Sequence, residues 1–125
     1  MKCLKTIGKQ GEVIAWQYLA KRGYQIVTTN FQTRFGELDI ICQKDQTLIF
    51  VEVKTRTSFM LGWPEEAVSP KKLGHLLKAM AEFQSRQAIE RPVRFDVMAV
   101  VILPGQKAKV KHWINLTQDF EVNPE

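Results

Sequence analysis

Two acidic residues and a lysine interrupt two otherwise apolar runs near the middle of the 125-residue chain. Asp39 lies within residues 36–42, and Glu52 and Lys54 lie within residues 48–56. Mg²⁺ and Mn²⁺ prefer oxygen ligands, and Mg²⁺ usually keeps waters that leave room for a phosphate oxygen. Lys54 shares a strand face with Glu52 and would hold or help deprotonate an attacking water. These residues therefore indicate metal-assisted hydrolysis of a phosphodiester.

The two runs are expected to form a β-hairpin, because both are rich in β-branched and apolar residues and a polar segment separates them. With a two-residue turn at 45–46, Asp39 faces Glu52 and Glu37 faces Lys54. Carboxylates placed directly opposite each other repel, so a cation should lie between Asp39 and Glu52. A register shifted by one residue would turn one of these acids to the opposite face.

Both faces of this hairpin should be covered near its turn. Because side chains alternate along a strand, one face is wholly apolar and carries Leu38, Ile40, Cys42, Ile49, Val51 and Val53. The other face is charged only at its far end and is apolar near the turn, where it carries Ile41, Leu48 and Phe50. The acids then lie at the mouth of a core. The alternative is a surface hairpin with an incidental ion pair between Glu37 and Lys54.

A third acid, Glu12, occupies an unusual place in the first predicted helix. Residues from about 6 to 21 favour a helix, whose buried stripe is marked by Ala15, Trp16 and Leu19. Helical spacing carries that stripe back to Glu12, which puts a carboxylate at the end of an apolar face. Glu12 could join the other acids. Equally, it could pair with Lys5 or Lys9, or favour the positive end of the helix dipole.

A second helix and further strands complete the expected fold. Residues 24–29 alternate enough to form a strand, after which Asn30 begins a connection to the hairpin. Ser69 followed by Pro70 is typical of a helix start. The helix that follows should bury an aliphatic stripe made of Leu73, Leu76, Leu77, Met80 and Phe83.

Two C-terminal strands are also expected. Residues 94–103 form a strongly β-branched run typical of a central strand, in which Asp96 can pair with Arg94 or another basic residue. Alternating lysines within residues 107–111 suit an edge strand, because charged edges resist aggregation. His112 is expected to be structural rather than catalytic.

Four cationic residues are candidates for contacts with nucleic acid: Arg34, Arg56, Lys71 and Lys72. Arg34 could contact a phosphate or neutralise Glu37. The lysine pair at a helix start opposes the usual preference for acidic residues there, and suits a backbone phosphate. A solvated lysine pair is the alternative. The formal net charge of +5 favours a polyanionic partner without proving one.

Length and composition are those of one ordinary globular domain spanning residues 1–125, with a tail from about residue 117 that is expected to fray. Cys3 and Cys42 have no metal-ligand spacing and indicate reduced thiols in a cytoplasmic protein. The sequence shows neither a signal segment nor a membrane span. The apolar residues near 59–63 could cover the core, stack on bases, or form a subunit contact in a homodimer.

These motifs resemble two known groups of proteins. An acid on one strand followed by Glu52-Val53-Lys54 on the next is similar to the signature of restriction-endonuclease-like nucleases. The whole pattern, from about Gly8 to Trp113, resembles the YraN family of bacterial proteins. The segments that carry this resemblance are Gly11–Glu12, Arg34–Asp39, Phe50–Lys54 and Arg94–Val97.

The resemblance implies an α/β fold with a restriction-endonuclease-like core, in which a mixed sheet of about five strands is flanked by two main helices. It further implies that Asp39, Glu52 and the Val53 carbonyl would bind Mg²⁺ or Mn²⁺. In the similar archaeal Holliday junction resolvases a glutamate of the first helix joins the metal, which implies that role for Glu12. One departure is Leu38, because many restriction enzymes have proline before the acid.

The sequence thus predicts a divalent-metal-dependent endonuclease acting on DNA, with branched or repair intermediates as candidate substrates. Its catalytic residues would be Asp39, Glu52, Lys54 and Glu12. A nucleic-acid-binding module on a nuclease scaffold, without turnover, is the main alternative. A scaffold protein that binds a protein partner is the third hypothesis, and it predicts neither salt-dependent DNA binding nor metal uptake.

Overall fold

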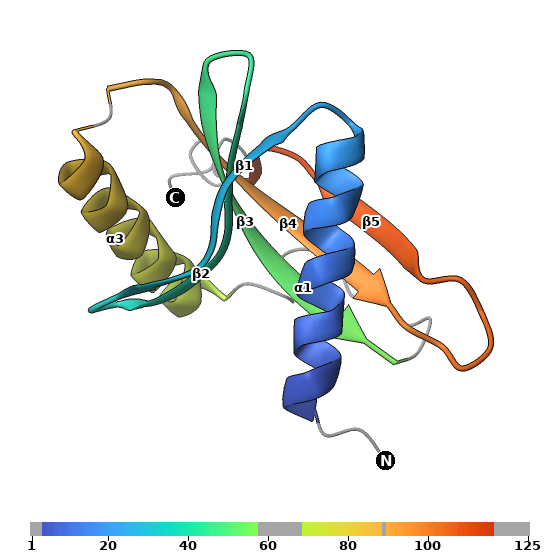
Figure 1. The fold of residues 1–125 in the computed structure, drawn as a ribbon. Coiled ribbons are helices and arrows are strands. Elements are labelled where there is room, and N and C mark those ends of the chain that lie inside the picture. The colour runs from blue at the N-terminus through green and yellow to red at the C-terminus, as the bar shows by residue number, and fades with distance from the viewer. Residues whose placement is uncertain (1–3, 58–68, 89, 117–125) are drawn as a thin grey trace.

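The computed structural model describes residues 4–57, 69–88 and 90–116. Within these described residues, two helices and five strands follow one another (Figure 1). Their bounds are α1 Leu4–Lys21, β1 Gln25–Thr33, β2 Gly36–Lys44, β3 Thr47–Arg56, α3 Pro70–Gln87, β4 Val93–Val101 and β5 Lys109–Trp113. The predicted loop near 59–63 and the tail from 117 lie outside the described residues. In the described part of the chain, neither helix has the length and apolar character needed to cross a membrane.

The five strands form one sheet in the order β1-β2-β3-β4-β5. β3 and β4 are parallel, and the other neighbours are antiparallel. The connection between the parallel strands contains α3, as such a pair requires. The architecture is therefore α/β with a five-stranded mixed sheet and two helices, as predicted. β4 is an interior strand and β5 is the lysine-bearing edge strand, which confirms both expectations.

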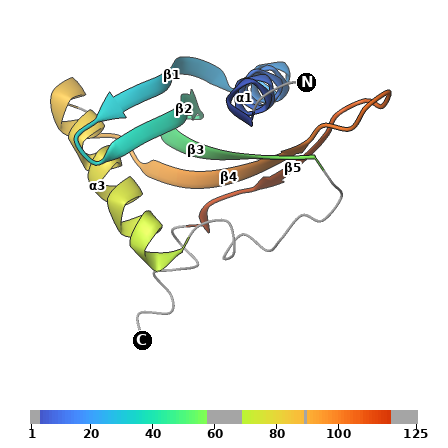
Figure 2. The ribbon, with the colours of Figure 1, turned by 90° about the horizontal axis from the view of Figure 1, so that it is seen from below.

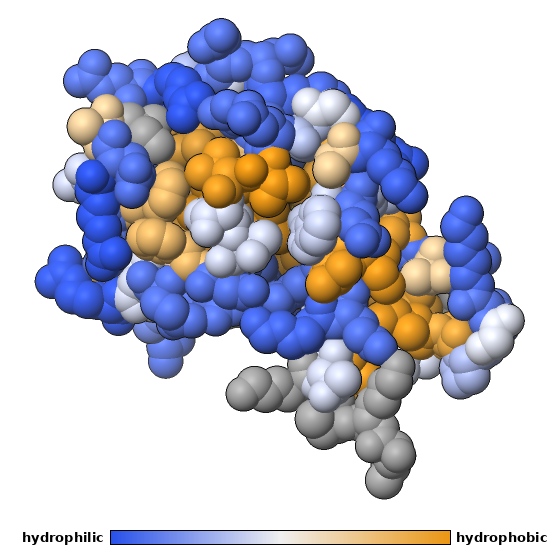
Figure 3. All heavy atoms as spheres, in the orientation of Figure 1, coloured by the Kyte–Doolittle hydropathy of each residue, from blue (hydrophilic) through white to orange (hydrophobic). Residues whose placement is uncertain are grey.

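The helices cover opposite faces of the curved sheet, as Figure 2 shows. One apolar cluster joins α3 to the sheet and includes Ile41, Leu48, Phe50, Leu76 and Phe83. The other joins α1 to the sheet and includes Ala15, Leu19, Ile40, Ile49 and Val51. In Figure 3 hydrophobic residues gather near the centre of the view, over the strands between the helices. The prediction that both hairpin faces are covered near the turn is confirmed.

The hairpin between β2 and β3 has the predicted register near its turn, but the predicted backbone pairs Asp39–Glu52 and Glu37–Lys54 are not formed. Asp45 and Gln46 both have positive φ, at 51° and 69°, which is the geometry of a tight two-residue hairpin turn. Pairing runs from Lys44–Thr47 to Ile40–Val51 and stops there, although β2 stays paired with β1 as far as Gly36. β2 therefore separates from β3 at Asp39, and Figure 1 shows the two strands diverging. We call this place the strand fork.

The structure corrects three details of the sequence prediction. β1 continues through Asn30 to Thr33, because Asn30 adopts a left-handed φ of 51° within the strand instead of ending it. Leu38 joins the cluster under α3 instead of sharing a face with Ile40, because β2 has left the plane of β3 there. Leu77 is 42% exposed, and Ala79 takes its expected place in the buried stripe of α3.

Asp96 is fully buried and its carboxylate is fully partnered. Arg94 donates two hydrogen bonds to it, at 2.9 and 2.8 Å. His112 Nε2 lies 2.8 Å from Asp96 Oδ2, and the Asn115 backbone N–H donates to Oδ1 at 2.9 Å. These contacts confirm the predicted pairing of Asp96 with Arg94, and His112 contacts the same carboxylate.

Gly11 allows α1 to approach β3 closely. A Cβ added at this position would lie 1.9 Å from Thr55 Oγ1 and 2.9 Å from Thr55 Cβ. We therefore expect Gly11→Ala to destabilise the protein by about 1–3 kcal/mol through overpacking, despite the better helix propensity of alanine. Gly8 of the same helix is the matched control, because a Cβ there meets nothing within 4 Å.

Urea unfolding of the two variants checks this expectation. Gly8→Ala should be more stable than the wild type by about 0.5–1 kcal/mol, since alanine loses less backbone entropy than glycine on forming a helix. Equal stabilisation by both substitutions would show that the close approach of α1 to Thr55 is not a constraint.

Candidate metal and nuclease site

A pocket of about 580 Å³ opens at the strand fork. Four structural elements contribute to it: α1, β2, β3 and the N-terminal turns of α3. Its polar lining contains all of the predicted catalytic residues, together with side chains that the sequence analysis did not place there. The charged or titratable residues that line it are Glu12, Glu37, Asp39, Glu52, Lys54, Lys71, Lys72 and His75.

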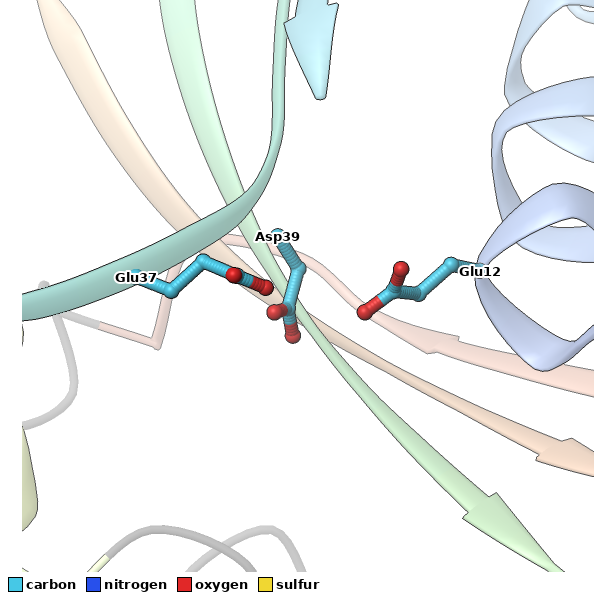
Figure 4. Close-up of side chains that lie close together, drawn as sticks. All are labelled: Glu12, Glu37 and Asp39. Atoms are coloured by element: carbon cyan, nitrogen blue, oxygen red, sulfur yellow. The ribbon is translucent and has the colours of Figure 1, made fainter. Parts of the chain in front are cut away.

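Three carboxylates converge on one side of this pocket. One oxygen each from Glu12, Glu37 and Asp39 can be chosen so that all three lie within 4.8 Å of one another. Figure 4 shows Glu12 pointing from α1 and Glu37 pointing from β2, both toward Asp39. The Asn30 side-chain amide donates to Glu12 at 2.8 Å and to Glu37 at 3.0 Å, so it holds these two carboxylates in place.

Asp39 links this carboxylate cluster to β3. Its Oδ2 accepts a hydrogen bond of 2.8 Å from the Val53 backbone N–H, just beyond the last paired residues of β2 and β3. Burial, followed by the neighbouring carboxyl of Glu52, raises the pKa of Asp39 from 3.8 to about 8. The surroundings of Asp39 therefore disfavour its ionised form, and a cation bound beside it would stabilise that form.

Glu52 faces the pocket from the lysine side and is only 6% exposed. Its Oε2 lies 2.5 Å from Lys72 Nζ and 3.9 Å from Lys54 Nζ. A cation was predicted between Asp39 and Glu52, and in the structure the Lys72 ammonium group from α3 contacts Glu52. The Ser69 side chain caps α3 by accepting from the Lys72 backbone N–H at 3.2 Å, which fixes the first turn that carries Lys72.

The two lysines have pKa values displaced in opposite directions. Burial, followed by the contact with Lys72, lowers the pKa of Lys54. Burial also opposes the charged form of Lys72, but hydrogen bonding to Glu52 and Lys54 raises the pKa of Lys72.

The other predicted site residues are placed as follows. Lys71 is exposed and lines the pocket, whereas Arg56 lines a neighbouring pocket that shares Glu12 and Lys54. Arg34 does not contact the cluster of Glu12, Glu37 and Asp39; its Nε donates instead to Glu82 of α3 at 3.1 Å. It therefore neither neutralises Glu37 nor lines the site pocket.

Glu12 and Glu37 resolve two alternatives that the sequence left open. Glu12 does form an ion pair with Lys9 at 3.6 Å, and it also joins the carboxylate cluster, so the two descriptions hold together. Glu37 accepts hydrogen bonds from Asn30 and Gln32. The surface hairpin with a Glu37–Lys54 ion pair is therefore not the arrangement adopted.

Two residues of this site, Glu37 and Asn30, were not predicted from the sequence. Glu37 was assigned opposite Lys54, because a regular hairpin would place it there, but the strand fork turns it toward Glu12. Asn30 was assigned to a connection, although it holds two of the carboxylates. An asparagine with left-handed φ next to a predicted acidic site was the available signal.

The donor chemistry fits a hard divalent cation. The converging groups are carboxylate oxygens, without the sulfur or imidazole ligands that favour zinc or copper. Glu12, Glu37 and Asp39 would hold the ion. Glu52, which neighbours Asp39, and the Val53 carbonyl stay predicted ligands. Val53 lines the same pocket and is tied to Asp39 by its backbone N–H.

The raised pKa of Asp39 predicts a specific pH effect on stability. Its folded pKa of about 8 exceeds the ordinary value of 3.8, so ionising Asp39 destabilises the metal-free fold increasingly from about pH 4 to pH 8. Asp39→Asn removes this cost and can still accept the Val53 hydrogen bond. Thermal unfolding in EDTA should show the variant stabilised at pH 9 by more than at pH 5; an equal difference at both values would contradict this.

Comparison with known proteins identifies the family. A family described as "Uncharacterised protein family UPF0102" matches residues 11–100. A UPF0102 protein of Syntrophomonas wolfei is 46% identical over 112 residues, which cover 89% of this chain and 96% of that protein. A UPF0102 protein of Caldicellulosiruptor bescii is 42% identical over 118 residues, which cover 93% and 97%. The chain therefore belongs to the UPF0102 family, which is the YraN family that its motifs resemble.

Proposed function

We propose that this protein is a divalent-metal-dependent endonuclease that hydrolyses phosphodiester bonds in DNA. The observation that supports it most strongly is the pocket at the strand fork, where a three-carboxylate cluster lies beside a buried glutamate and two lysines. A carboxylate cluster alone is common on protein surfaces. Here the clustered acids come from α1 and β2, Glu52 and Lys54 come from β3, Lys72 comes from α3, and all of these residues line one pocket.

Each group has a role that its surroundings favour. A bound Mg²⁺ or Mn²⁺ ion would lower the pKa of an attacking water and offset charge on the phosphate. Glu12, Glu37 and Asp39 would hold that ion. Lys54, whose pKa is lowered by burial and by Lys72, accepts a proton from the water. Lys72 stays charged and stabilises the negative charge that develops on the phosphate oxygens.

DNA is the proposed substrate class because the pocket combines metal ligands with cations placed for phosphate contacts. Lys71 is exposed, and the half-buried Lys72 contacts Glu52. The net charge of +5 favours long-range electrostatic attraction of a polyanion such as DNA. Branched or repair intermediates are the candidate forms of that DNA.

Cleavage of labelled linear, nicked and four-way DNA tests the proposal. Wild-type protein with Mg²⁺ should cut at least one of these substrates, EDTA should stop the reaction, and Glu52→Gln should lower the rate by about 100-fold or more. Glu52→Gln keeps the size of the side chain while it removes the charge beside Lys54 and Lys72. Metal-indifferent binding by both proteins with no cleavage would favour a nucleic-acid-binding module without turnover.

A further inference from the structure

A second pocket, also of about 580 Å³, lies next to the candidate site. It is formed by the turn between β1 and β2 and by the exposed side of α3, which the Arg34–Glu82 ion pair holds together. Figures 1 and 2 both show this turn beside α3. Phe35 lines both pockets, so the second pocket continues the first. Its lining residues are Arg34, Phe35, Lys78, Ala81, Glu82, Ser85 and Arg86.

One face of α3 runs along both pockets. Lys71 and His75 line the first pocket, and Lys78, Glu82 and Ser85 line the second. These positions are spaced by three or four residues, so they lie on one side of the helix. The distance along the axis from the first to the last is roughly 21 Å, about the rise of six nucleotides in one strand of a duplex. The two pockets together form an extended groove between α3 and the turn.

The second pocket has an excess of positive charge. Arg34 and Arg86 share the single carboxylate of Glu82, and Lys78 adds another cation. Three cationic side chains therefore surround one acid. Guanidinium groups that share a carboxylate keep other N–H donors available for phosphate oxygens.

Phe35 gives this basic groove an aromatic surface. Its side chain is 36% exposed at the tip of the β1–β2 turn. The Arg34 guanidinium carbon lies 5.3 Å from the centre of its ring, and the Lys78 ammonium nitrogen lies 5.8 Å from it. An exposed ring flanked by cations is the arrangement by which proteins stack an unpaired base beside its phosphates. A paired base inside a duplex does not offer its face to such a ring.

We propose that the groove between α3 and the β1–β2 turn binds an unpaired DNA strand that continues from the candidate site. Phe35 stacks on a base, and Lys78 with the arginine pair contacts phosphates. This proposal extends the nuclease assignment by naming the form of its substrate, namely duplex DNA with a single-stranded extension. The binding itself uses none of the carboxylates of the metal site.

Fluorescence anisotropy in EDTA tests this groove without turnover. The probes are a labelled blunt duplex and the same duplex with a single-stranded overhang. The wild type should bind the overhang probe more tightly than the blunt duplex, and Phe35→Leu should reduce this preference by about fivefold or more. Lys78→Gln should weaken binding and flatten its dependence on salt. Thermal unfolding confirms that each variant is folded.

Lys21→Gln is the matched control, because it makes the same change at an exposed residue at the end of α1, outside both pockets. The groove is ruled out if Lys78→Gln and Phe35→Leu bind like Lys21→Gln, if the wild type binds both probes equally, or if it binds neither. Overhang-dependent binding that needs Phe35, without cleavage in Mg²⁺, would remove the nuclease proposal and leave the groove. Cleavage in Mg²⁺ together with unaltered overhang binding by Phe35→Leu and Lys78→Gln would remove the groove and leave the nuclease proposal.

Discussion

Replacing Asp39 with asparagine should reduce metal-dependent DNA cleavage by at least about 100- to 1000-fold. Asp39 is the group that joins the carboxylates of Glu12 and Glu37 to β3, and it lies next to Glu52. The substitution keeps the size of the side chain and its ability to accept from Val53, but it removes one charge from the proposed ligands. Losing several kcal/mol of interaction with the ion corresponds to this range. Single-turnover cleavage with saturating Mg²⁺ measures the effect.

Asp45→Asn is the control for this experiment. It makes the same chemical change in the hairpin turn, where asparagine tolerates the φ of 51° that Asp45 adopts. Cleavage by Asp45→Asn should equal that of the wild type. If Asp39→Asn retains full activity while Asp45→Asn is also active, the carboxylate cluster takes no part in the reaction.

Asp96→Ala is expected to destabilise the protein by about 3–5 kcal/mol, lowering the melting temperature by roughly 10–20 °C. The fully buried carboxylate binds Arg94, His112 and the Asn115 backbone, and its removal leaves the partly buried Arg94 without its counter-charge. Glu90→Ala removes an exposed carboxylate and should change the stability little. Urea unfolding monitored by circular dichroism compares the two.

The network around Asp96 should also make the stability of the protein depend on pH in acid. Burial opposes ionisation, but the hydrogen bonds from His112 and Arg94 hold the pKa of Asp96 below its ordinary value of 3.8. Its contribution is therefore present above that pH and is lost as the pH falls through the lower folded pKa. The stability difference between wild type and Asp96→Ala should shrink below about pH 4. A difference that is small at pH 7 would show that the network does not stabilise the fold.

The elements close to the hairpin could be predicted because local chemistry determines them. The polar residues between two β-branched runs set the turn at Asp45 and Gln46, and the turn sets the pairing as far as Ile40 and Val51. Helical spacing likewise placed Glu12 at the sheet. These relationships connect residues close in sequence or depend on a simple period.

The strand fork could not be predicted, because it depends on how β2 follows β1 away from β3. A regular hairpin would have put Glu37 opposite Lys54, but in the structure Glu37 reaches Glu12 from another element. The contact between Lys72 and Glu52 was also hidden, because it depends on where α3 docks against the sheet. The sequence showed the charges of the site, whereas their partners follow from tertiary packing.

Glu12, Glu37 and Asp39 are proposed to bind a divalent cation. Anomalous diffraction from crystals grown with Mn²⁺ tests it most directly, because the signal locates the metal without reference to activity. The predicted result is an anomalous peak among these three carboxylates, lost in crystals of Asp39→Asn. Well-diffracting crystals soaked in excess Mn²⁺ that show no peak at the strand fork would contradict it.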